Sequence, residues 1–105
     1  MRREEYIIDG KMWVRIPKQL AHRMYVCNIP LLIAPCKFRL DGIWGCGFYC
    51  KKAEQQKEYG YTPHFRTLVN EYEYYICNHE LGKYAKFFVN QYDLTSYELE
   101  LERHR

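Results

Sequence analysis

The sequence contains a single serine, Ser96, and almost none of the motifs that mark familiar enzyme classes. No nucleophile motif surrounds Ser96, so hydrolysis through a serine nucleophile has no support. The glycines of residues 42–47 fall within a predicted strand and match neither the Walker nor the dinucleotide-binding spacing. These absences argue against serine hydrolases and against the common nucleotide-binding folds.

Long apolar runs are also absent. The longest, residues 29–35, is far too short to cross a bilayer, and the charged stretch 1–9 does not have the pattern of a signal peptide. The number of cysteines is five, and an odd number fits a reducing compartment better than a disulfide framework. We therefore expect a cytoplasmic protein that has no membrane partner.

The chain is rich in aromatic residues. Its 105 residues are 48% apolar and 17% aromatic and include eleven tyrosines, which is enough for one domain over 1–105 without a cofactor or metal. The net charge of +3 is unevenly distributed: 1–58 holds eleven Lys/Arg and six Asp/Glu, whereas 59–105 holds five and seven. A basic half of this size favours an anionic partner only weakly.

Residues 62–77 carry the only strong helical period. Thr62 is a good N-cap, and Pro63 suits the first helical position. The apolar stripe repeats at the spacing of an α-helix and needs a sheet to cover it. Its members are Phe65, Leu68, Val69, Tyr72, Tyr75 and Ile76.

Two Asp-Gly pairs, each between strand-like segments, predict hairpins with two-residue turns. The first, Asp9-Gly10, pairs Tyr6 with Trp13 and Ile7 with Met12. The second, Asp41-Gly42, joins strands at roughly 33–40 and 43–50. Residues 18–26 are predicted to form a helix or a strand, with the helix favoured. Residues 83–91 and 96–102 are predicted to form strands, and apolar and acidic residues alternate strictly along the second of them.

Together these elements predict an α+β fold. The expected architecture is an antiparallel sheet of about five to six strands built from the two hairpins, with one main helix, about 62–77, on one face. The sheet residues expected to contact that helix are Ile7, Met12, Val14, Phe38, Leu40, Ile43 and Leu99.

The sheet face away from the helix is predicted to combine aromatic and basic side chains. Such a face can bind a protein, because Trp, Tyr and Arg dominate interaction hot spots, or it can stack nucleic-acid bases. Alternatively, other segments of the chain cover it and it forms a second small core. The candidate partner-binding residues are Tyr6, Trp13, Arg15, Lys37, Arg39 and Trp44.

Cysteine and histidine residues allow a weaker alternative. Cys46, Cys50, Cys77 and His79 have zinc-like spacings, but Cys46 and Cys50 in one strand would lie roughly 13 Å apart. A nucleophilic pair of Cys77 and His79 lacks an orienting third group. We therefore expect no catalytic or metal residues, although a zinc-stabilised domain or small cysteine enzyme stays open.

A short, tyrosine-rich chain without a catalytic motif has the general profile of phage or mobile-element proteins that inhibit host machinery by binding it. The sequence therefore predicts a small non-enzymatic binding protein that occludes or regulates a macromolecular partner. A protein partner, for example in nucleic-acid-handling machinery, is the first expectation, direct nucleic-acid binding is the second, and a homodimer is compatible with either.

Overall fold

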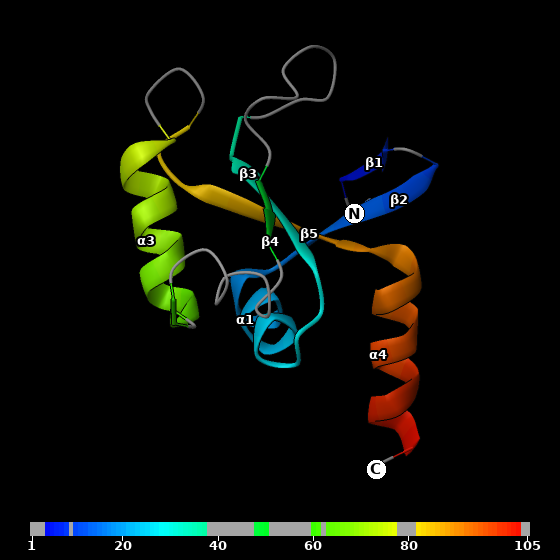
Figure 1. Ribbon diagram of the computed structural model, residues 1–105. Helices are drawn as coiled ribbons and strands as arrows, with labels where there is room; N and C mark the ends of the chain where they lie inside the picture. The colour runs from blue at the N-terminus through cyan, green and yellow to red at the C-terminus, as the bar shows by residue number, and fades with distance from the viewer. Residues whose placement is uncertain are drawn as a thin grey trace.

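The computed structural model describes residues 4–8, 10–37, 48–50, 60–61, 63–77 and 82–103 (Figure 1). It confirms an α+β fold with an antiparallel sheet, and its described residues contain three helices where the sequence predicted one main helix. The strand order is β1-β2-β5-β3-β4. The strands are β1 (Glu5–Ile8), β2 (Lys11–Ile16), β3 (Leu31–Pro35), β4 (Phe48–Cys50) and β5 (Ala85–Asn90); the helices are α1 (Lys18–Val26), α3 (Phe65–Tyr75) and α4 (Gln91–Arg103).

The first hairpin forms in the predicted register, with Tyr6 opposite Trp13 and Ile7 opposite Met12. Gly10 has the positive φ, 77°, that such a turn requires. The predicted burial of Ile7 and Met12 is wrong, because these side chains are 69% and 37% exposed. The neighbouring strand β5 ends at Asn90, opposite Trp13, so the Ile7–Met12 pair lies beyond the end of β5.

The second hairpin differs from its prediction. Strand β3 begins two residues earlier than predicted and ends at Pro35, which has no N–H to continue the ladder. Cys36 and Lys37 form a turn instead of strand, and the Cys36 N–H donates to the Tyr84 carbonyl at 2.8 Å. Ile33 lies opposite Phe48. The predicted turn and the predicted core residues of 38–47 fall outside the described residues.

Strand β5 confirms the predicted strand at 83–91, but its position was not predicted. It lies between β2 and β3 and is antiparallel to both. Val89 is opposite Val14 on one side and Leu31 on the other. The sheet is therefore more than two adjacent hairpins, because a strand from late in the chain joins them.

Helix α1 confirms the helical alternative for 18–26. Ala21, Met24 and Tyr25 are its buried residues. The helix ends in a Schellman motif: Asn28 has φ 62°, its N–H donates to the Tyr25 carbonyl, and the Ile29 N–H donates to the Met24 carbonyl at 2.9 Å. The apolar Ile29 packs against the core, so the chain turns directly from helix into β3.

Helix α3 confirms the predicted helix but begins later. His64 is the N-cap, with an extended backbone and no side-chain cap, and the predicted cap Thr62 lies outside the described residues. Pro63 is therefore outside the helix, where its carbonyl accepts from the buried Tyr25 hydroxyl at 2.7 Å. Four stripe residues are buried, whereas Tyr75 and Ile76 are 76% and 43% exposed.

Helix α4 overturns the predicted strand at 96–102. Leu and Glu are strong helix formers, and the helix has an N-terminal cap in which the Asn90 side chain accepts from the Tyr92 N–H at 2.9 Å. Leu94 is buried, whereas Leu99, predicted to face the core, is 56% exposed. No helix in the described ranges is long and apolar enough to cross a bilayer.

All three helices pack on one face of the sheet, where they share an apolar cluster with it. The opposite face holds a smaller cluster of Trp13, Leu32, Ala34 and Phe88, with Tyr6 packed against it. Lys86, on the same face, is only 3% exposed. Among the described residues, the sheet therefore has a larger and a smaller apolar cluster on its two faces, and a buried lysine lies on the face of the smaller one.

Candidate protein-binding surface

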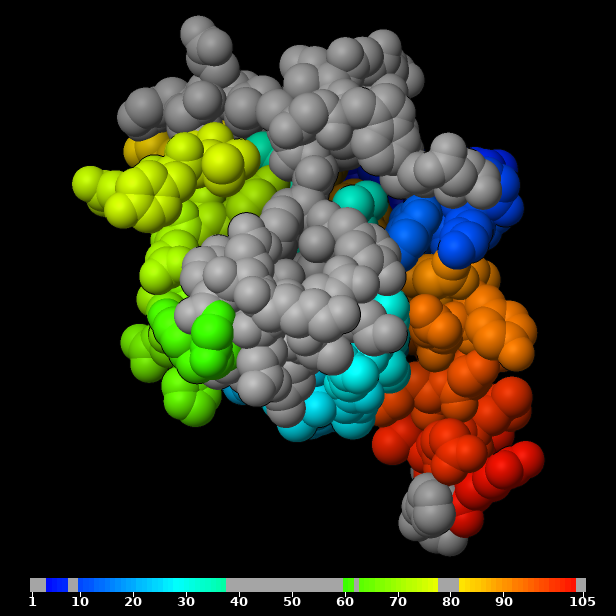
Figure 2. Space-filling view, in the orientation of Figure 1, coloured from blue at the N-terminus to red at the C-terminus, as the bar shows by residue number. Residues whose placement is uncertain are grey.

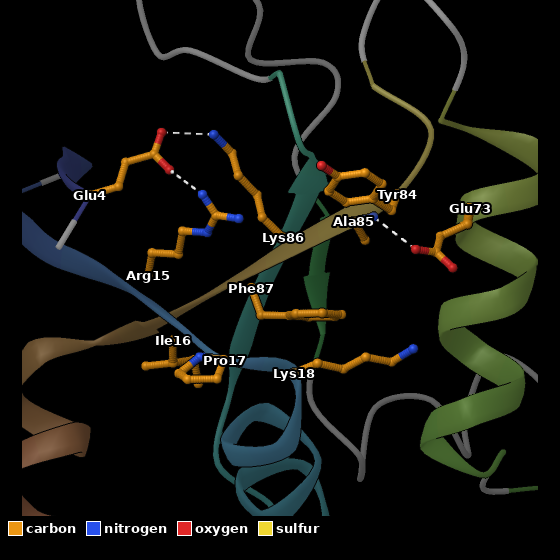
Figure 3. Close-up of a pocket in the computed structure, with 10 residues that line it drawn as sticks. All are labelled: Glu4, Arg15, Ile16, Pro17, Lys18, Glu73, Tyr84, Ala85, Lys86 and Phe87. Atoms are coloured by element: carbon orange, nitrogen blue, oxygen red, sulfur yellow. Dashed lines mark hydrogen bonds and ion pairs between the residues drawn. The ribbon is translucent and has the colours of Figure 1, made fainter.

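A groove of about 730 Å³ runs between α3 and the strands β2 and β5, and Figure 3 shows the side chains around it. We name it the α3 groove. Its apolar lining comes from Ile16, Pro17 and Phe87, and Arg15 and Lys18 add cations on either side of them. The groove therefore offers an apolar surface between charged groups, which is the usual composition of a recognition site.

Three side chains form an ion cluster at one end of the α3 groove. Lys86 Nζ lies 2.7 Å from Glu4 Oε1, and Arg15 Nη1 lies 3.5 Å from Glu4 Oε2. The Tyr6 hydroxyl also donates to Glu4 Oε1. The Lys86 ammonium lies 5.5 Å from the centre of the Phe88 ring, so an aromatic face contributes to its surroundings. A carboxylate thus compensates a cation that has left water.

The Glu4 carboxyl has a pKa below its ordinary value of 4.5. Its partial burial alone raises the pKa, but the hydrogen bonds from Lys86 and Tyr6 and the charges of Lys86 and Arg15 outweigh that effect. Glu4 is therefore ionised at neutral pH. It binds the first residues of the described chain to β5, 82 positions away.

The C-terminal end of α3 forms the other wall of the α3 groove. Glu73 accepts the Ala85 N–H at 2.9 Å, which joins the helix to the start of β5. Tyr74, Tyr75 and Tyr84 are 80%, 76% and 61% exposed. Tyr84 lines the α3 groove itself, and the rings of Tyr74 and Tyr75 meet edge to face at 4.9 Å. Figure 2 shows this end of α3, in yellow-green, standing out from the surface.

The predicted partner-binding residues do not all lie on one open face. Trp13 is 7% exposed and lies within the smaller apolar cluster, with Tyr6 partly buried beside it. Arg15 is exposed and lines the α3 groove, and Lys37 is exposed in the turn after β3. Arg39 and Trp44 lie outside the described residues. Of the described candidates, only Arg15 is part of the α3 groove.

Of the four residues proposed for a zinc site or cysteine enzyme, only Cys77 has a described side chain. Within the ranges that the structure describes, no three His, Cys, Asp or Glu residues are grouped closely enough to hold a metal ion. Cys46 and His79 lie outside those ranges, as does the side chain of Cys50. Burial, with the nearby Glu73 and Cys36, raises the pKa of the Cys77 thiol to about 11. Cys77 is therefore a protonated thiol at neutral pH, which is the opposite of an activated nucleophile.

Several residues of the surface were missed by sequence reasoning. Lys86 has the same strand parity as Phe88 and therefore lies on the face opposite the helices, which was not predicted. Nothing in the sequence showed that Glu4 would meet it there, because 82 positions separate the two residues. Tyr74 did carry a signal, because it falls outside the apolar stripe of its helix.

Comparison with known proteins adds no further assignment. The chain matches no family model, and neither a search of curated proteins nor a search of solved structures finds a significant match. Any function proposed for the chain therefore rests on the surface chemistry that the structure shows.

Proposed function

We propose that this chain is a small non-enzymatic binding protein that occludes or regulates a protein partner. The observation that carries the proposal is the α3 groove, where the exposed Tyr84 adjoins an apolar lining and the accessible cations of Arg15 and Lys18. Tyr and Arg are the residue types most enriched at binding hot spots. A partner in nucleic-acid-handling machinery, as with inhibitors from phages or mobile elements, and a cytoplasmic location remain part of the proposal.

The chemistry of the groove favours a protein over a nucleic acid. Arg15 and Lys18 are cations, but the carboxylates of Glu4 and Glu73 line the same groove. A phosphate backbone would meet both charges, whereas a protein side chain can fill the apolar part and pair with either sign. Trp13 is buried in the smaller cluster, so it does not supply a stacking surface.

A quantitative pull-down from a lysate of the source cells tests this proposal. Tyr84→Ala and Arg15→Ala remove two exposed groups of the groove, and we expect each to reduce recovery of the same protein about tenfold. Tyr92→Ala is the matched control, because Tyr92 is 78% exposed on α4 and does not line the groove. If the groove variants recover that protein as well as the wild type, the α3 groove is not the binding surface.

Direct nucleic-acid binding is the competing function, and its dependence on salt distinguishes it. A nucleic-acid binder loses affinity for single- or double-stranded oligonucleotides steeply as salt rises, because bound counterions are released. We expect weak oligonucleotide binding that Tyr84→Ala does not change. Tight, steeply salt-dependent binding that Arg15→Ala abolishes would replace the protein partner with a nucleic acid.

A further inference from the structure

Helix α4 extends beyond the part of it that packs on the body. Leu94 is its only buried residue among the 13 of the helix, and Tyr97 is half-buried. The last two turns carry Leu99 and Leu101, which are 56% and 51% exposed. In Figure 2 the orange-to-red helix projects from the molecule. Short helical segments are marginal in water, so a further contact would stabilise these turns.

The exposed end of α4 has a definite apolar stripe. At the α-helical period, Leu101 follows Leu94 and Tyr97 on one side of the helix, so the core-facing stripe continues past the body. Leu99 lies on the other side of the helix. Leu101 therefore extends a surface that the fold already uses for packing, and Leu99 does not.

A crevice lies beside this stripe. It has a volume of about 290 Å³ and is lined by His22, Arg23, Val26 and Cys27 of the α1 segment and by Tyr97 of α4. Val26 is 58% exposed although it is apolar. The crevice thus offers an apolar surface beside a cation, at a place where α4 supplies one wall.

The charges of the two helices are complementary. Helix α4 carries four acids and one arginine, a net charge of −3, and Glu98 and Glu102 flank Leu101. Arg23 lies in the last turn of α1 at the crevice. Across the described ranges, neither Arg23 nor these two glutamates makes an ion pair. The acidic, partly apolar end of α4 is therefore complementary in charge and polarity to the crevice beside Arg23, which every copy of this chain carries.

We propose that the occupant is a second copy of this chain. Two α4 helices pack antiparallel about a two-fold axis, and Leu101 of each copy enters the crevice of the other between α1 and α4. The arrangement is isologous and closed, so it ends at a dimer. It places the acidic C-terminal half of each α4 beside the positive N-terminal end of its partner. The α3 groove is not used, so this proposal is independent of the proposed function.

Sedimentation equilibrium tests the dimer. We expect the wild type to show twice the 12.9 kDa of one chain. Leu101→Glu should weaken the dimer by about 100-fold in dissociation constant. Leu99→Glu is the matched control, since it places the same charge on the same helix at nearly equal exposure, and it should remain dimeric. Circular dichroism shows whether each variant folds.

A charge exchange keeps the proposal testable if Leu101→Glu fails to fold. Arg23→Glu and Glu102→Arg should each weaken the dimer about tenfold, and the double variant should regain most of the loss. The proposal is overturned by a wild type that stays monomeric up to about 1 mM, the limit of weak association. It is also overturned if Leu101→Glu leaves the dimer intact, or if the double charge variant shows no recovery.

Discussion

The two faces of the sheet are stabilised in different ways. The helix-covered face packs apolar residues from α1, α3, α4 and three strands into one cluster. Among the described residues, the opposite face has a smaller apolar cluster and adds Lys86, whose buried ammonium pairs with the Glu4 carboxylate. The first face should therefore respond to lost volume and the second to lost charge.

The largest effect is expected on the helix-covered face. Phe65 is 4% exposed, and its ring contacts Tyr25 and Phe87 at 5.6 and 5.5 Å between centroids. Phe65→Ala should lower the free energy of unfolding by about 3–5 kcal/mol in urea denaturation, because the cavity cannot refill. Tyr92→Ala, at an exposed position, should change it by less than ~0.5 kcal/mol. A loss at Phe65 as small as the control's would show that this face is loosely packed.

The ion pair should respond asymmetrically. Glu4→Ala leaves the Lys86 ammonium buried without its carboxylate and should cost on the order of 3 kcal/mol. Lys86→Met keeps most of the side-chain volume, and the remaining carboxylate, whose side chain is 28% exposed, reaches water, so the loss should stay near ~1 kcal/mol. If urea denaturation shows equal losses of stability for Glu4→Ala and Lys86→Met, the burial of the lysine does not depend on the ion pair.

How much of this comparison the sequence could predict depends on the range of the contacts. The period of α3 and the turn chemistry of the first hairpin are local, so the helix and the register were both predicted. The alternation of YELELE is equally local, but Leu and Glu suit a helix as well, and the Asn90 cap decided the outcome for α4. Local patterns do not encode long-range pairing, so the meeting of Glu4 with Lys86 and the α3 groove were not predictable.

A smaller effect is expected where α4 joins the covered face with only one buried residue. Asn90→Ala removes the oxygen that accepts the Tyr92 N–H and should cost about 1 kcal/mol. Hydrogen exchange should show the loss in α4 while α3 keeps its protection, because α3 buries four residues and α4 buries one. Equal loosening of both helices would mean that the face unfolds as one unit.

The pH dependence of the opposite face has a definite direction. Because the folded pKa of Glu4 lies below its ordinary 4.5, the protein gains stability from this carboxylate above that value. The gain is lost as the pH falls through the lowered folded pKa. Urea denaturation from neutral to acid pH should show this loss, and Glu4→Gln should flatten that part of the profile. An unchanged profile in Glu4→Gln would assign the acid sensitivity to other groups.

The central place of β5 also sets an order of events in folding. Strands β2 and β3 do not pair with each other, and both hydrogen-bond to a strand that lies after most of the described chain. Closing such long loops precedes the gain from pairing, so we expect slow folding. During synthesis on a ribosome, the edges of β2 and β3 that pair with β5 keep unpaired backbone N–H and C=O groups until β5 has emerged. A nascent chain halted before Ala85 lacks the strand that joins β2 to β3, so it exposes unpaired strand edges and we expect it to bind chaperones.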